Sequence, residues 1–162
     1  MKNNTMLAIS CVLGLTAAEV GSQPTPQDIR GVWQMTEVTI TGPNARVISS
    51  RDALLIVAGG YYSFTRVTTD QPRPEPTDYA SATADELRAV WGPFTANAGT
   101  YELSAGIFTT RPMVAKNPGA MAPGSFSVWS YRLDGNSLTV TEQRNRNGPV
   151  TNPATFKYTR LE

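Results

Sequence analysis

Trp129-Ser-Tyr-Arg-Leu-Asp-Gly-Asn-Ser-Leu-Thr-Val-Thr-Glu142 is the stretch of sequence that decides the fold class. Its central Asp-Gly-Asn-Ser favours a tight turn, because Gly and Asn readily adopt the backbone conformations that such turns need. Pairing outward from the turn places Tyr131 beside Val140 and Trp129 beside Glu142. Since Val belongs in a core, the alternation predicts an antiparallel hairpin whose inner face carries all four of these side chains.

The rest of the chain continues in the same manner, with short β-type runs separated by turn residues at regular spacing. This pattern is typical of a β-sandwich or a β-barrel. A second hairpin is expected around Ser104-Ala-Gly106, with Tyr101 on the same face as Arg111. We predict eight strands, at about residues 32–40, 53–58, 61–68, 99–103, 107–114, 125–133, 137–143 and 154–161.

One short helix is expected between the third and fourth of these strands. Thr83-Ala-Asp-Glu86 has the spacing of a capping box, in which the Thr hydroxyl and the Glu carboxylate each bond the other residue's backbone amide. Gly92-Pro93 ends the helix. The preceding Gln71-Pro-Arg-Pro-Glu-Pro76 predicts an extended connector, or alternatively one rim of a lid over a barrel mouth. The segment from Met113 to Met121 is expected to be a surface loop, with lid contacts as the alternative.

Composition restricts the chemistry that the protein can perform. The chain has 162 residues, 40% hydrophobic and 17% charged, which fits one folded domain. A net charge of +1 gives no reason to expect nucleic acid as a partner. The absence of histidine excludes Ser-His-Asp catalysis and His-ligated zinc. The scattered acidic residues show no calcium-loop spacing and no phosphate-binding motif occurs, so we expect neither a metal nor a cofactor.

The first residues have the pattern of an export signal. Met1-Lys2 is a short positive start, and an apolar run over residues 6–18 follows, with small residues at Thr16 and Ala18. We therefore predict a signal peptide at 1–18, a flexible leader at 19–27 and a periplasmic or extracellular protein. A buried N-terminal helix and a lipoprotein acylated at Cys11 are the alternatives. Cleavage after Ala18 removes Cys11, the only cysteine, and with it any disulfide or thiolate chemistry.

Gly31-Val-Trp33, at the start of the first predicted strand, resembles the signature of lipocalins and related barrels. The resemblance implies that Trp33 closes one end of a barrel and stacks on an arginine from near the end of the chain. Arg160 stands at that position. A guanidinium over an indole face gains roughly 0.5–2 kcal/mol by cation–π attraction. Gly31, Trp33 and Arg160 are accordingly the residues expected to close the barrel.

Five segments, the first of which contains Gly31-Val-Trp33, resemble the bacterial lipocalin-like domain family, which has a calycin-type β-barrel. In this order and spacing they cover nearly all of residues 28–161. The resemblance implies an all-β, eight-stranded antiparallel up-and-down barrel over residues 28–162, with a cavity. The segments are Asp28-Ile-Arg-Gly-Val-Trp33, Gly60-Tyr-Tyr-Ser-Phe64, Tyr79-Ala-Ser-Ala-Thr-Ala-Asp-Glu86, Ala98-Gly-Thr-Tyr-Glu102 and Tyr131-Arg-Leu-Asp-Gly135.

Side chains of one parity along the strands are expected to face the barrel interior. Aromatic walls with a few polar groups are typical of small-molecule pockets. For each aromatic residue taken singly, burial statistics favour ordinary core packing. For the charged residues the alternatives are structural pairs inside the barrel or, with the parity off by one, exposure to water. The predicted ligand-binding residues are Met35, Glu37, Phe64, Arg66, Tyr101, Arg111, Trp129, Tyr131, Glu142, Phe156 and Tyr158.

Three functions follow from such a barrel. The leading hypothesis is a protein that binds or carries a small, partly hydrophobic molecule in the cavity. The second is a cofactor-free enzyme of cyclase or isomerase type, in which Glu142 or Tyr131 transfers a proton to a confined substrate. The third is a structural or interaction module that uses the outer strand faces or the Pro-rich segment. The sequence names neither the ligand nor the oligomeric state.

Overall fold

The computed structural model describes residues 28–49 and 52–162. The predicted signal peptide, the leader and Cys11 therefore lie outside the described residues. The described strands and helices, in chain order, are β1 (Gly31–Ile40), β2 (Arg46–Ser49), β3 (Ala53–Ala58), β4 (Tyr61–Val67), α1 (Ala84–Trp91), β5 (Phe94–Ser104), β6 (Ile107–Ala115), the 3-10 helix η1 (Pro118–Met121), β7 (Ser127–Asp134), β8 (Ser137–Asn145), β9 (Gly148–Pro149) and β10 (Ala154–Arg160).

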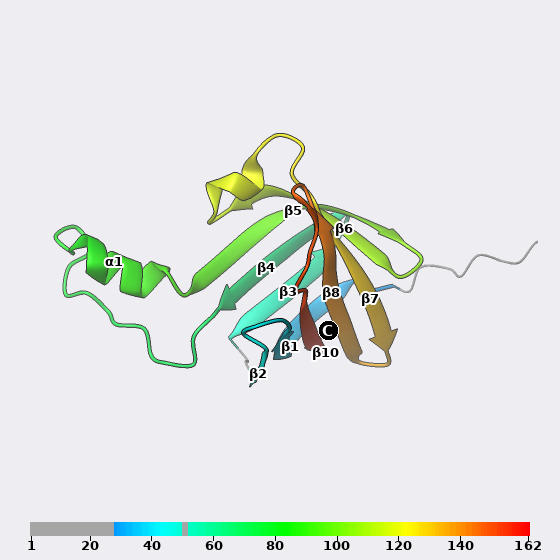
Figure 1. The fold of residues 1–162 in the computed structure, drawn as a ribbon, viewed down its shortest axis with the longest axis horizontal. Helices are drawn as coiled ribbons and strands as arrows, with labels where there is room; N and C mark the ends of the chain where they lie inside the picture. Colours follow the sequence, from blue (N-terminus) through cyan, green and yellow to red (C-terminus); the bar gives the residue numbers. More distant parts are fainter. Residues whose placement is uncertain (1–27, 50–51) are drawn as a thin grey trace, which may run out of the picture.

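Eight of these strands close into a barrel (Figure 1). Each strand pairs antiparallel with the next along the chain, in the order β1, β3, β4, β5, β6, β7, β8 and β10. The last strand, β10, pairs with β8 on one side and with β1 on the other, which closes the ring. This topology confirms the predicted up-and-down barrel and the architecture that the resemblance to lipocalin-like domains implies.

Two short strands lie outside the ring and were not expected from the sequence. The four-residue β2 pairs with the second half of β1, and the two-residue β9 pairs with the end of β8. Both are too short for side-chain alternation to identify them, and β9 contains Pro149, which cannot donate a backbone hydrogen bond.

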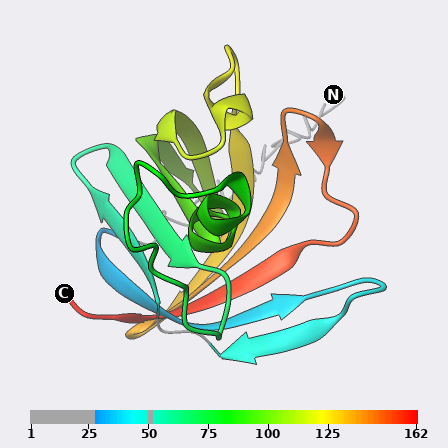
Figure 2. The same cartoon turned by 90° about the vertical axis from the view of Figure 1, so that its left-hand side faces the viewer.

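The helix α1 lies between the third and fourth strands of the ring, where the sequence predicts it. Its N-terminus has the predicted capping box, with the Glu86 amide bonding the Thr83 hydroxyl and the Thr83 amide bonding the Glu86 carboxylate. The helix and the Pro-rich segment before it project from the barrel beyond the end of β4 (Figure 1), and Figure 2 shows them in front of the ring of strands. Among the described residues, no helix has the length and apolar character to cross a membrane.

The floor of the barrel, defined here by Trp33 and Arg160, is closed as predicted. The Trp33 side chain is fully buried, and the Arg160 guanidinium carbon lies 4.1 Å from its ring centroid. Arg160 also donates a 2.6 Å hydrogen bond to the Arg30 carbonyl, and the Trp33 indole donates one of 2.9 Å to the Ile29 carbonyl. These contacts join the beginning of β1 to the end of β10.

Gly31 is needed where β1 begins, because the chain ends approach it closely. Its φ is +140°, and a Cβ atom there would lie 2.3 Å from the carbonyl oxygen of Glu162 and 2.6 Å from an Arg160 nitrogen. Only glycine fits such a conformation and such an approach. The three residues predicted to close the barrel are therefore brought together at its floor.

The predicted inward orientation of Glu37 and Arg111 is wrong. In β1 the register shifts between Met35 and Glu37, so that Val38 is buried while Glu37 pairs outward with Lys157 at 2.6 Å. A bulge of this kind reverses the side-chain parity beyond it.

In the hairpin of β5 and β6 the turn has two residues, with Ser104 opposite Ile107. This register places Thr110, not Arg111, beside Tyr101 on the inner face. Arg111 is exposed and pairs with Glu102 outside the barrel.

Candidate ligand cavity

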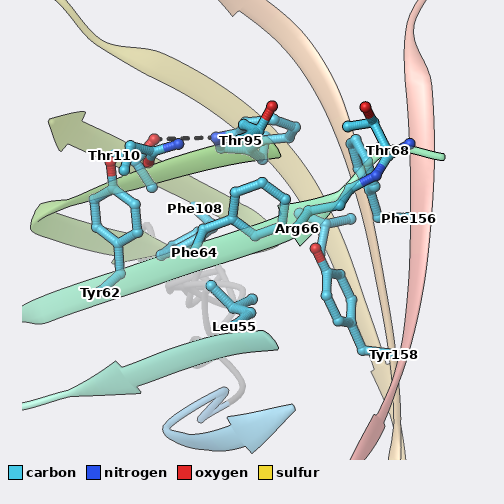
Figure 3. A pocket seen from close by; sticks show the side chains of 13 residues that line it. Leu55, Tyr62, Phe64, Arg66, Thr68, Thr95, Phe108, Thr110, Phe156 and Tyr158 are labelled. Carbon is cyan, nitrogen blue, oxygen red and sulfur yellow. Dashed lines mark hydrogen bonds between the residues drawn. The ribbon is translucent and has the colours of Figure 1, made fainter. Parts of the chain in front are cut away.

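The barrel encloses a cavity of about 250 Å³ on the inner face of its strands (Figure 3). Every strand of the ring except β1 contributes at least one lining side chain. Apolar and aromatic groups dominate the lining, as is usual in small-molecule sites. The cavity is lined by Leu55, Tyr62, Phe64, Arg66, Thr68, Thr95, Asn97, Phe108, Thr110, Trp129, Val140, Phe156 and Tyr158.

Strand alternation explains how these residues reach the cavity. Tyr62, Phe64 and Arg66 are alternate residues of β4 and share its inner face, because successive side chains of a strand point to opposite sides. On β10, Phe156 and Tyr158 do the same. A single strand therefore supplies both apolar surface and a charged group to the same space.

Aromatic rings form the wall and hold one another in place. The Phe156 ring meets Trp129 at 5.9 Å and Phe64 at 6.4 Å between centroids, both edge to face, and Tyr62 meets Phe108 at 6.2 Å. Edge-to-face pairs of this kind contribute roughly 0.5–1.5 kcal/mol beyond the area they bury. The wall is therefore an interlocked apolar surface that offers ring edges and faces to a ligand.

Arg66 is the charged group of the cavity. Its guanidinium carbon lies 5.6 Å from the centroid of the Phe156 ring, and its Nε is buried without a protein hydrogen-bond acceptor. Burial lowers the pKa of the guanidinium, because desolvation disfavours the cation. The Thr95 side chain faces the same cavity from the residue paired directly with Arg66 across β4 and β5.

Tyr62 and Thr110 form a second polar region. The Trp129 indole donates a 3.1 Å hydrogen bond to the Thr110 hydroxyl, drawn as a dashed line in Figure 3. The buried Tyr62 hydroxyl has no protein partner with hydrogen-bond geometry, although Thr110 lies near enough to affect it. Desolvation raises the pKa of Tyr62 to about 12, against a smaller lowering by Thr110. The phenol is therefore neutral at physiological pH and can donate a hydrogen bond.

The cavity contains part of the predicted ligand-binding set. Phe64, Arg66, Trp129, Phe156 and Tyr158 line it together. Whether they bind a ligand stays a prediction. The other predicted residues lie elsewhere: Met35, Tyr101 and Tyr131 pack in or against the core, Glu37 and Arg111 point outward, and Glu142 bonds other side chains.

Glu142 and Tyr131, the residues assigned to proton transfer in the enzymatic alternative, do not line the cavity. The Glu142 carboxylate accepts hydrogen bonds from the Ser127 hydroxyl at 3.2 Å and from the Asn145 amide at 3.3 Å. Tyr131 is 7% exposed and belongs to the hydrophobic core cluster.

Several lining residues were missed by sequence reasoning. Tyr62 carries the same alternation signal as Phe64, two residues away, and was open to prediction. Thr95 and Asn97 were missed because β5 begins five residues before the expected strand, in a Thr-Ala-Asn-Ala sequence with no apolar alternation. Among residues 28–49 and 52–162, no group of three or more Cys, Asp or Glu side chains is placed to hold a metal ion.

Comparison with known proteins finds only distant structural likeness. The chain matches no protein-family model and no curated protein. The crystal structure of a lipocalin-like protein from Bacteroides uniformis is 13% identical over 83% of this chain and all of that one, with a TM-score of 0.48. An uncharacterized protein from Bacteroides eggerthii is 10% identical over 83% of this chain and all of its own, with a TM-score of 0.46. At this level of likeness neither structure indicates a ligand or an activity for this chain.

Proposed function

We propose that the protein binds a small, partly hydrophobic molecule inside the barrel. The observation that carries this proposal is the cavity of about 250 Å³, walled mainly by aromatic and aliphatic side chains. Natural cores are packed with few voids larger than a water molecule. A space of this size, lined by interlocked aromatic rings, exceeds an ordinary packing void and suits a small ligand.

The volume limits the size of the ligand. An apolar cavity of about 150 Å³ is enough to take up benzene. The cavity here is larger, at about 250 Å³, so the best candidates contain one ring with a short chain or two fused rings. Edge-to-face contact with Phe64, Trp129 and Phe156 favours an aromatic ligand.

The test uses neutral probes of this size and a variant that fills the space. Indole and 2-naphthol are titrated calorimetrically into the purified barrel domain and, in parallel, into Val140→Phe. Val140 lines the cavity and is 3% exposed, so the added ring occupies the space that the probe needs. Val47→Phe makes the same substitution at a residue of β2 that is 61% exposed, and serves as the matched control.

We expect the natural protein and Val47→Phe to bind a probe with similar affinity, and Val140→Phe to lose at least tenfold. Native mass spectrometry of the freshly purified protein gives a second measurement, in which a co-purified small molecule adds a discrete mass. If no probe binds the natural protein and the mass is that of the bare chain, the binding function is disproved.

We also propose that the protein acts after export, as the basic start and apolar run of residues 1–18 indicate. Expression of the full chain in a Gram-negative host tests this. A periplasmic product whose intact mass begins at Glu19 is the expected result. A cytoplasmic product that retains Met1 contradicts the proposal, and an acylated product beginning at Cys11 favours the lipoprotein alternative instead.

A further inference from the structure

We infer that the ligand of the cavity is an anion of carboxylate type, and that Arg66 binds its carboxylate. This inference rests on the proposed function and specifies the chemical class of the ligand. The lining residues include Arg66 and no Asp, Glu or Lys. The cavity therefore presents one positive charge within an otherwise uncharged wall.

Arg66 has no counter-ion among the residues that the structure describes. Of the ion pairs among the described residues, none includes Arg66. Arg66 also lines a neighbouring groove together with Asp52 and Asp70, yet neither carboxylate lies within ion-pair distance of the guanidinium. Desolvation lowers the Arg66 pKa most, and the like charge of Arg46 adds to this lowering.

A half-buried cation without a partner is unfavourable, since a charge partly removed from water needs compensating bonds. The Phe156 ring lies against Arg66 and compensates only in part, because a cation over a ring face makes no hydrogen bond. The Nε–H group remains buried with no acceptor. An anion that accepts a hydrogen bond from this group supplies the missing bond and the missing charge together.

The surroundings of Arg66 favour a planar carboxylate. Two parallel N–H donors on one edge of a guanidinium match the two oxygens of a carboxylate. Thr95, opposite Arg66 on β5, adds a hydroxyl group to the same part of the lining. The Thr68 hydroxyl, just after β4, also lies there but donates its hydrogen bond to the Pro93 carbonyl at 3.1 Å. Figure 3 shows Thr68 and Phe156 beside Arg66.

The rest of the cavity suits the apolar body of such a ligand. In Figure 3, Phe64 and Phe108 lie between Arg66 on one side and Tyr62 on the other. A ligand with its carboxylate on Arg66 extends its ring or chain across these phenyl groups. The neutral Tyr62 hydroxyl then lies at the far end, where it can donate to a carbonyl or hydroxyl oxygen.

The experiment compares three probes that differ only in the charge of one end. The probes are 3-phenylpropionate, its neutral amide and 3-phenylpropylamine, titrated calorimetrically at pH 7 into the natural protein, Arg66→Met and Arg111→Met. Arg66→Met keeps a long flexible side chain without the charge. Arg111→Met makes the same change on the outer face of β6 and controls for the loss of net charge. Circular dichroism confirms that each variant is folded.

We expect the natural protein and Arg111→Met to bind the carboxylate at least tenfold more tightly than the amide, and the amine most weakly. Charge-assisted hydrogen bonds are about twice as strong as neutral ones, which gives a preference of this order. In Arg66→Met the carboxylate affinity falls to that of the amide, while the amide affinity changes by less than about threefold.

The failures of the two proposals are distinct. If the amide binds the natural protein as tightly as the carboxylate does, or if Arg66→Met retains the preference for the carboxylate, the assignment of Arg66 is overturned while the binding function stands. If no probe of this series binds, and indole and 2-naphthol do not bind either, both proposals are overturned. If Arg66→Met does not fold, Arg66→Lys is measured instead, and it overturns the assignment if it prefers the amide.

Discussion

Arg160 joins the end of β10 to the beginning of β1 at the floor, and its contribution can be measured at the scale of one residue. Its guanidinium covers the Trp33 ring and bonds the Arg30 carbonyl. We predict that Arg160→Ala lowers the free energy of unfolding by about 2–3 kcal/mol, from the cation–π contact and the lost hydrogen bonds. Urea unfolding followed by Trp fluorescence measures this.

The matched control is Arg132→Ala, since the Arg132 side chain is 79% exposed and pairs with an exposed aspartate. Its effect should stay within about 0.5 kcal/mol, as for other surface substitutions. Equal losses in both variants would mean that Arg160 does not hold the floor together.

For Tyr62 we predict the opposite effect on the free energy of unfolding from that of Arg160→Ala. Its hydroxyl is buried without a protein hydrogen bond, and an unsatisfied buried group costs about 1–3 kcal/mol. Tyr62→Phe is therefore expected to leave the free energy of unfolding unchanged or to raise it by roughly 1 kcal/mol, measured by urea unfolding without ligand. Tyr61→Phe, one residue along β4 and 59% exposed, is the control with no expected change. A clear loss of stability in Tyr62→Phe alone would show that the hydroxyl is bonded.

The carboxyl of Asp28 gives a prediction about pH. Hydrogen bonds from the Arg30 side chain and backbone hold the Asp28 pKa at about 2, below the ordinary value of 3.8. A depressed folded-state pKa contributes stability above the unfolded value, and this contribution is lost as the pH falls from about 4 to about 2. Carboxyl chemical shifts in an NMR titration should give the low pKa directly. In Arg30→Gln the pKa should rise towards 3.8, and an unchanged value would exclude the Arg30 side chain as the cause.

At the scale of the element, we expect the stability of α1 to be largely independent of the stability of the barrel. The helix projects from the ring, so its capping box affects the helix more than the whole fold. Thr83→Ala should cost the helix about 1 kcal/mol and speed hydrogen exchange of the amides at 84–91 roughly fivefold. The midpoint of barrel unfolding should not move. A similar acceleration in Thr77→Ala, at an exposed residue outside the capping box, would contradict the role of the cap.

The elements also show what the sequence can and cannot predict. The hairpin of β7 and β8 pairs Tyr131 with Val140 and Trp129 with Glu142, as the turn residues predict. The hairpin of β5 and β6 differs because its turn is one residue shorter than the sequence predicts, which inverts the parity of β6. In β1 the bulge before Glu37 leaves no mark in the pattern of residue types. The positions of the strands were therefore predictable from the sequence. Which side chains face the interior depended on turn length and bulges.

For the candidate site, strand register likewise distinguishes the lining residues that the sequence predicted from those that it did not. Phe64, Arg66, Trp129, Phe156 and Tyr158 lie on strands whose alternation is unbroken up to the cavity. The lack of a counter-ion for Arg66 was not predictable, because it depends on where Glu37 and Glu142 point in three dimensions. The sequence suggested that these charges pair inside the barrel, whereas both carboxylates bond other groups.

At the scale of the whole molecule, ligand binding and stability are linked. A ligand that binds only the folded barrel stabilises it by about 2.7 kcal/mol at a hundredfold excess over Kd, which corresponds to roughly 10 °C in Tm for a domain of this size. We predict a rise of this order in differential scanning calorimetry with saturating 3-phenylpropionate. Val140→Phe, which fills the cavity, should show no such rise. An unchanged Tm in the natural protein at saturation would mean that the ligand does not bind the folded barrel in preference to the unfolded chain.

The incomplete pairing of β6 has a consequence for self-association. Only Ile107–Thr110 pair with β7, so the backbone of Arg111–Ala115 is paired on the β5 side alone. Met113 and Val114 are 63% and 68% exposed along this stretch. An unpaired strand edge with apolar side chains is a template on which another chain can add a strand.

Pro112, which lacks a backbone N–H, interrupts that edge. Aggregation of the folded protein should therefore begin at this stretch. Pro112 and the charged side chains of Arg111 and Lys116 oppose it, because they disfavour the addition of another strand.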